Sequence, residues 1–147
     1  MRFRIIAVGI SLCLSGIGYT ADWDRFRGPN GSGVAADDAA VPTEWSESQN
    51  LRWKVELPGP GVSCPIVVGD KVFVTSYSGY GESRDNIGDM KDLKRHLVCL
   101  DKSTGKVIWE KTIPSTAAED EYSGPGVPQH GYASHTPVSD GERVYMF

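Results

Sequence analysis

Apolar and polar residues alternate in short runs through the middle of the chain, and glycine-containing turns separate the runs. Residues 51–55 read Leu-Arg-Trp-Lys-Val, the pattern of a half-buried strand. A second run over 62–68 ends in three consecutive apolar residues, which favours a strand buried on both faces. Gly69-Asp70 stands between β-branched residues and predicts a tight turn, so a returning strand is expected over 71–76.

A second pair of strands is expected after a polar, glycine-containing segment over 77–95, which we interpret as a long loop. The strands are predicted over 96–100 and 106–111, with a turn over 101–105 between them. No sustained helical period is present. Four antiparallel strands in sequence order predict a β-meander, which is the unit of a propeller blade.

The sequence also repeats itself at a constant offset. Residues 65–74, Pro-Ile-Val-Val-Gly-Asp-Lys-Val-Phe-Val, recur without a gap as Pro-Val-Ser-Asp-Gly-Glu-Arg-Val-Tyr-Met over 137–146. The offset is longer than a usual propeller blade of about 40–50 residues, and the long loop accounts for much of the excess. Because repeat units cannot bury their faces alone, we expect the chain to be the N-terminal fragment of a longer protein.

Residues 1–21 have the pattern of a signal peptide. Arg2 and Arg4 precede an uncharged, mostly apolar segment over 5–17 that is too short to span a bilayer. The pattern predicts an exported protein, periplasmic or secreted, that does not span the membrane once the signal is removed. Cys13 follows a leucine rather than a small residue, so we interpret it as part of the signal and not as a lipid anchor.

Residues 22–49 contain too many glycines and prolines for a regular element. We predict an N-terminal arm whose aromatic residues, Trp23 and Phe26, dock on the body of the protein.

The formal charge of -4 and the pI near 5.3 argue against a nucleic-acid partner, because no basic face is available for phosphates. Export would permit a disulfide between Cys64 and Cys99. These residues would lie on the first and third strands, roughly 9–10 Å apart, whereas a disulfide needs Cα atoms within about 7 Å. We therefore predict two buried free thiols.

Candidate metal ligands are few. His130 and His135 have no cysteine or carboxylate beside them in sequence, and His96 opens a strand. The oxygen-bearing loop residues do not follow the order of a calcium loop and are balanced by nearby cations, so a solvated loop is predicted. These loop residues are Asp85, Asn86, Asp89 and Asp92. We predict no metal site and assign no catalytic residue.

The turn over 101–109, Asp-Lys-Ser-Thr-Gly-Lys-Val-Ile-Trp, matches the D-x-x-T-G-x-x-x-W core of the tryptophan-docking motif. Asp101 can accept backbone N–H bonds within the turn, Gly105 permits a positive φ, and Trp109 offers a large ring to bury between blades. The motif is typical of quinoprotein-dehydrogenase propellers and their cofactor-free relatives. The architectural positions that we predict are Asp101, Thr104, Gly105, Trp109 and Trp53.

Together with residues 22–33 and 53–59, these features resemble exported planctomycete proteins of the pyrroloquinoline-quinone-like (PQQ-like) β-propeller repeat family. The resemblance covers 22–147 and implies an all-β fold, a β-propeller of four-stranded antiparallel blades. It further implies an eight-bladed ring when complete, of which only the first one to two blades are present. The ring-closing strand would span 50–56, with Trp53 as the tryptophan of the final blade. Blade one would span about 62–112, and blade two would begin at about 132.

The resemblance implies two functions. The first is a non-catalytic scaffold whose loops bind protein, envelope polymer or another envelope ligand, as in the outer-membrane assembly propeller lipoprotein. The alternative is a quinoprotein alcohol or sugar dehydrogenase that uses pyrroloquinoline quinone (PQQ) and calcium. In the family that chemistry needs a catalytic aspartate and often adjacent cysteines, and the sequence has no adjacent cysteines. We favour the scaffold, for which no cofactor is expected.

Overall fold

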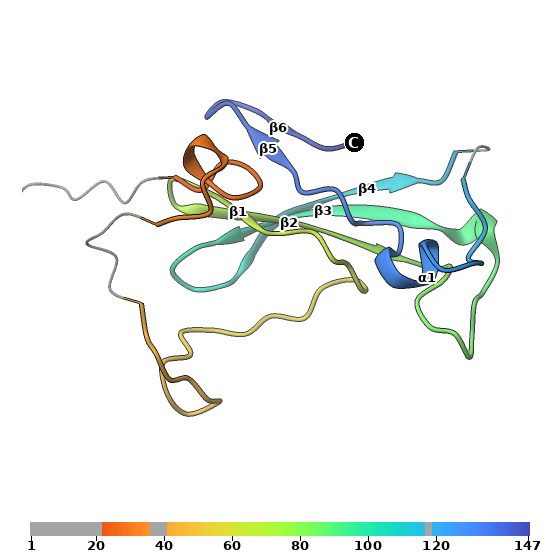
Figure 1. The fold of residues 1–147 in the computed structure, drawn as a ribbon, viewed down its shortest axis with the longest axis horizontal. Coiled ribbons are helices and arrows are strands. Elements are labelled where there is room, and N and C mark those ends of the chain that lie inside the picture. The colour runs from red at the N-terminus through yellow and green to blue at the C-terminus, as the bar shows by residue number, and fades with distance from the viewer. Residues whose placement is uncertain (1–21, 36–40, 117–118) are drawn as a thin grey trace, which may run out of the picture.

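A four-stranded antiparallel sheet forms the centre of the structure, a computed structural model that describes residues 22–35, 41–116 and 119–147 (Figure 1). The strands are β1 (Ile66–Val68), β2 (Lys71–Ser78), β3 (Lys94–Asp101) and β4 (Val107–Pro114). Their order is β1-β2-β3-β4, so each strand pairs with its neighbour in sequence, and the predicted meander is confirmed. The predicted signal peptide over 1–21, including Cys13, lies outside the described residues.

The loop predicted over 77–95 is shorter than expected, because β2 and β3 extend into it from both sides. The two strands pair along their whole length, from Lys71 opposite Asp101 to Ser78 opposite Lys94. The sequence did not predict these ends of β2 and β3, because polar side chains occupy one face of the sheet there. The alternation of apolar and polar residues that indicates a strand is therefore absent. The remaining loop contains a short 3-10 helix at Met90–Asp92.

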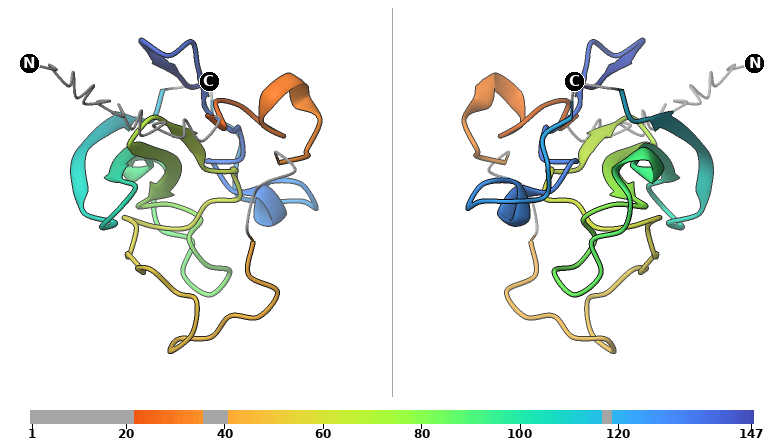
Figure 2. Two further views of the ribbon diagram at one scale, coloured as in Figure 1. Left: turned by 90° about the vertical axis from the view of Figure 1, so that its left-hand side faces the viewer. Right: turned by 90° about the vertical axis from the view of Figure 1, so that its right-hand side faces the viewer.

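The second copy of the repeat forms a small hairpin, β5 (Val138–Ser139) and β6 (Val144–Tyr145). Its two residue pairs, Val138↔Tyr145 and Ser139↔Val144, are the repeat equivalents of Ile66↔Phe73 and Val67↔Val72. The internal repeat is therefore a repeat of strand register as well as of sequence. β5 and β6 lie on one side of the sheet, and the segment over 41–57 lies on the other (Figure 2).

The ring-closing strand predicted over 50–56 stays a prediction, because the last blade that it would complete is not among the described residues. Residues 51–57 pair with no strand in the described part of the chain, although the period-two pattern is retained. Trp53, Val55 and Leu57 are partly buried, whereas the residues between them are exposed. Alternation records burial on one side of an extended segment, but a strand also requires a neighbouring backbone to pair with. The alternation in the sequence indicates the burial on one side but not the presence of a neighbouring backbone.

The N-terminal arm attaches to both copies of the repeat. Trp23 and Val67 exchange two backbone hydrogen bonds of 2.8 and 2.9 Å at the free edge of β1. The carbonyl of Asp24 accepts a 2.8 Å bond from the amide of Ser139, the repeat equivalent of Val67. The prediction that both aromatic residues dock is wrong for Phe26, which is 57% exposed. Its ring lies against the neighbouring Arg27 guanidinium, 5.6 Å from the ring centroid.

Helical structure is confined to short turns in the described residues. These are a 3-10 helix at Pro29–Gly31 in the arm, the one at Met90–Asp92, and the single-turn helix α1 (Val127–His130). The described part of the chain is therefore mostly β, and its main sheet has the strand order of a propeller blade.

Candidate functional site

The turn between β3 and β4 is held by the Asp101 side chain. Its Oδ1 accepts backbone N–H bonds from Ser103 at 3.0 Å and Thr104 at 2.8 Å, as the sequence predicted for this turn. The hydroxyl groups of both residues donate to the same oxygen, at 2.6 and 2.7 Å. These bonds, with those from the Ser103 and Thr104 hydroxyls largest, lower the pKa of Asp101 to about 2. Gly105 ends the turn with φ at +72°.

Trp53 docks on this turn from a distant part of the sequence. Its indole Nε1–H donates to the carbonyl oxygen of Lys102 at 2.9 Å. A Cβ added to Gly105 would lie 2.6 Å from Cδ2 of the Trp53 ring, so no side chain fits between the ring and the turn. The structure thus brings together two of the architectural residues that the sequence singled out, Trp53 and Gly105.

Trp109 lies on the face of the sheet toward the second copy of the repeat. Its ring is tilted against Phe73 with centroids 5.8 Å apart. Both rings belong to a cluster around Leu97 and Cys99 on which Val144 and Met146 of the second copy also pack; the full set is Ile66, Val68, Phe73, Leu97, Cys99, Trp109, Val144 and Met146. The second copy of the repeat thereby covers this face of the sheet.

Cys64 and Cys99 are free thiols, as predicted. Cys99 is fully buried, and burial raises the pKa of its thiol. Cys64 is only partly buried, so the prediction of burial is wrong for this residue. It precedes β1, and its amide donates to the Thr136 hydroxyl at 3.0 Å.

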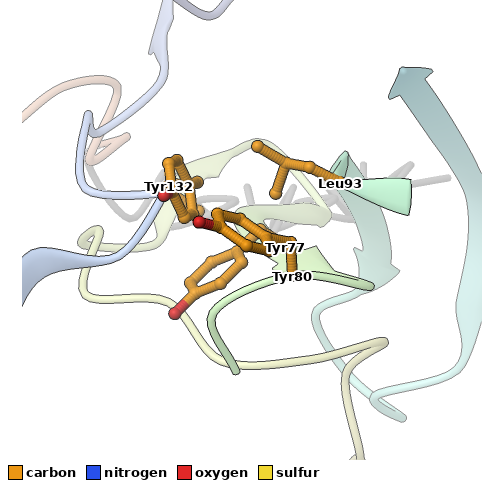
Figure 3. Close-up of a cluster of buried hydrophobic side chains, with 5 residues drawn as sticks. Tyr77, Tyr80, Leu93 and Tyr132 are labelled. Atoms are coloured by element: carbon orange, nitrogen blue, oxygen red, sulfur yellow. The ribbon is translucent and has the colours of Figure 1, made fainter. Parts of the chain in front are cut away.

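A cluster of tyrosines closes the far end of the sheet, where Tyr77, Tyr80 and Tyr132 gather around Leu93 (Figure 3). The rings of Tyr77 and Tyr132 meet edge to face with centroids 5.4 Å apart. Their hydroxyl groups donate to backbone carbonyls, Tyr77 to Gly81 and Tyr132 to Asp120. Burial raises the pKa of Tyr132 to about 12, so this phenol remains a neutral donor.

A paired arginine ties the segment before the second copy to the sheet. The Arg95 guanidinium donates to both carboxylate oxygens of Glu119, at 2.5 and 2.6 Å, and its Nε donates to the Tyr132 carbonyl at 3.0 Å. The arginine hydrogen bonds lower the pKa of Glu119 and raise that of Arg95. The pair lines a cavity of about 480 Å³ that also has His135 on its wall. Because each guanidinium nitrogen already donates within the chain, Arg95 positions this segment rather than offering a free cation.

The other residues considered as metal ligands in the sequence do not come together in one site. His135 lies at the cavity, whereas His130 ends the exposed last turn of α1. Asp89 accepts the backbone N–H of Lys91 and pairs with its ammonium at 2.8 Å, so it caps the 3-10 helix of the loop. Within the described ranges, no group of three or more His, Cys, Asp or Glu side chains could hold a metal ion.

The tyrosine cluster and the Arg95–Glu119 pair were not predicted from the sequence. Their signal was faint: Tyr77 and Tyr80 lie at the start of the segment predicted as a loop over 77–95, and Tyr122 and Tyr132 lie in a second polar segment before the second copy of the repeat. Only the fold shows that these two segments lie against each other.

Comparison with known protein families gives a match over part of the chain. Residues 90–147 match the family described as outer membrane protein assembly factor BamB, a PQQ-like repeat. The matched region contains β3, β4, the Asp101–Gly105 turn and the second copy of the repeat. No curated protein and no solved structure matches the chain. No helix over the ranges that the structure describes is long and apolar enough to cross a membrane.

Proposed function

Residues 90–147 form a PQQ-like repeat domain of the BamB-like type, and from this premise we propose that the protein is a β-propeller scaffold that binds partners in an exported compartment. The observation that carries the proposal is the repeated strand register. The two copies of the repeat pair in the same way and share the core around Phe73 and Trp109. Such stacking is how blades bury their faces in a propeller.

A blade whose Trp109 face is covered by the second copy of the repeat leaves its loops as a surface for partners. The loop between β2 and β3 spans residues 79–93, and residues 82–89 of it are all exposed. It is held from inside by Tyr80 and Leu93, which are buried. An exposed loop on a rigid support is suited to recognising protein or envelope polymer, because little order is lost on binding.

Site-specific photo-crosslinking in the full-length exported protein tests the loop. A photoreactive residue at Asn86 is expected to capture an envelope protein or polymer that the same probe at Lys111, exposed on β4, does not capture. Equal capture at the two positions, or none at Asn86, would remove the loop from the proposal.

Dye reduction tests the alternative of a quinoprotein dehydrogenase. The full-length protein is assayed with alcohols and sugars, with and without PQQ and Ca²⁺, and a scaffold is expected to give no rate above the protein-free control. Activity that depends on both additions would overturn the scaffold.

The proposal also includes export, which N-terminal sequencing tests. The mature protein should begin between about Tyr19 and Asp24, and an envelope form that retains Met1 would contradict export.

A further inference from the structure

One face of the sheet carries a row of polar side chains across three strands. His96 of β3 is opposite Ser76 of β2 and Thr112 of β4. Ser78 and Glu110 each lie two positions along the strand from one of these partners. Because side chains two positions apart share a face of a sheet, all five point to the same side, away from the core that contains Trp109.

Three of these side chains form a hydrogen-bonded chain. The Nε2 atom of His96 is 2.8 Å from the Ser78 hydroxyl, and its Nδ1 atom is 2.7 Å from Oε1 of Glu110. A carboxylate can only accept, so Nδ1 carries the proton, and Nε2 presents its lone pair to the Ser78 O–H. The Thr112 hydroxyl donates to the same Glu110 oxygen at 3.2 Å and fixes that carboxylate. This is the arrangement of nucleophile, base and orienting acid found in serine hydrolases.

The surroundings shield the base and leave the serine within reach. The His96 side chain is 6% exposed, whereas that of Glu110 is 37% exposed, and Ser78 is partly exposed at the end of β2. The hydroxyl of Ser76, directly opposite His96, is fully buried and has no hydrogen-bond partner in the described structure.

From this geometry we propose that Ser78 is an activated nucleophile that small carboxylic esters acylate. The Ser78 oxygen attacks the carbonyl carbon while its proton passes to Nε2 of His96. The ester C–O bond then breaks, and the alcohol leaves with that proton. Water, deprotonated in turn by His96, attacks the acyl-serine, which releases the carboxylic acid and restores Ser78. Glu110 is a positioning residue that holds the imidazole in the required tautomer.

Lys94 supplies a cation near the reacting centre. It is opposite Ser78 in the β2–β3 register and on the same face, and its side chain is exposed. Side chains at opposite positions of neighbouring strands have Cβ atoms about 5 Å apart, so the ammonium can approach the oxygen on which negative charge develops. The inference goes beyond the proposed scaffold function, because it depends on the sheet face and not on the loops.

Labelling of the full-length protein with a fluorophosphonate probe, followed by peptide mapping, tests the proposal. The adduct is expected on Ser78 and to form faster there than on Ser83, an exposed loop serine of the same molecule. His96→Ala should slow labelling of Ser78 by about 100-fold or more, the usual effect of a lost general base. Glu110→Gln should slow it as well, whereas Glu110→Asp, which keeps the carboxylate, should recover part of the rate.

Circular dichroism must show that each variant is folded, and the comparison of Ser78 with Ser83 needs no variant at all. Three results would overturn the proposal: no adduct on Ser78 of the folded protein, labelling no faster than at Ser83, or a rate at Ser78 that His96→Ala leaves unchanged. Hydrolysis of p-nitrophenyl acetate is a second assay of the same site. The folded protein is expected to hydrolyse this ester, and Ser78→Ala is expected to abolish the hydrolysis.

Discussion

Replacement of Gly105 by alanine should release Trp53 from the docking turn. Two costs combine at this position. The backbone has φ at +72°, where a side chain is strained, and the new Cβ would lie 2.6 Å from two atoms of the Trp53 ring. The turn is fixed by Asp101, so the ring has to move rather than the backbone.

The magnitude follows from the contacts that are lost. The left-handed backbone costs an alanine about 1–2 kcal/mol. Displacement of Trp53 removes the hydrogen bond from its Nε1 to Lys102, about 1 kcal/mol, and exposes part of a large ring, about 1–2 kcal/mol. The total is about 3–5 kcal/mol. Gly69 offers a matched control, since its φ is +58° and nothing lies within 4 Å of an added Cβ. Gly69→Ala should cost only the free energy of placing an alanine in the left-handed backbone conformation, about 1–2 kcal/mol.

Native-state hydrogen exchange of the full-length protein measures the free energy of local opening around residues 101–109. A double-mutant cycle with Trp53→Ala isolates the steric contribution, because in that background Gly105→Ala should cost about as much as Gly69→Ala. The coupling between the two sites is expected at about 2–3 kcal/mol. Equal costs for Gly105→Ala and Gly69→Ala, or additivity in the cycle, would refute the docking argument.

Three further predictions concern charges and thiols. Hydrogen bonds lower the pKa of Asp101 from 3.8 to about 2, so its stabilising effect is fully present above about pH 5 and is lost as the pH falls toward 2. The free energy of unfolding in urea should therefore fall with pH over this range, and Asp101→Asn should remove that dependence. Glu119→Gln leaves the partly buried Arg95 guanidinium without its carboxylate, so hydrogen exchange of the segment before β5 should accelerate at least tenfold, and unchanged exchange would contradict the role of the pair. Under native conditions a thiol reagent should modify Cys64 well before Cys99, which is 0% exposed with a raised pKa, as mass spectrometry can establish; simultaneous modification would contradict the packing.

Local patterns were sufficient for the elements whose signals lie within a few positions of each other. The turn at Gly69 and the turn from Asp101 to Gly105 form as predicted, because their geometry is set by backbone preferences and by one side chain that reaches the next few amides. The strand expected over 51–55 depends on more than a local pattern. Its alternation reflects a segment with one buried side, but no neighbouring strand in the described residues pairs with it.

The sequence by itself determined the meander, its two tight turns, the internal repeat and the residues of the docking turn, since each depends on local backbone geometry or on a period along the chain. Only the tertiary structure decided which distant residues meet. Trp53 on Gly105, Arg95 on Glu119, and Ser78 with His96 and Glu110 each depend on strand register and on which segment covers which face. A register shift by a single position would send strand side chains such as His96 to the opposite face of the sheet.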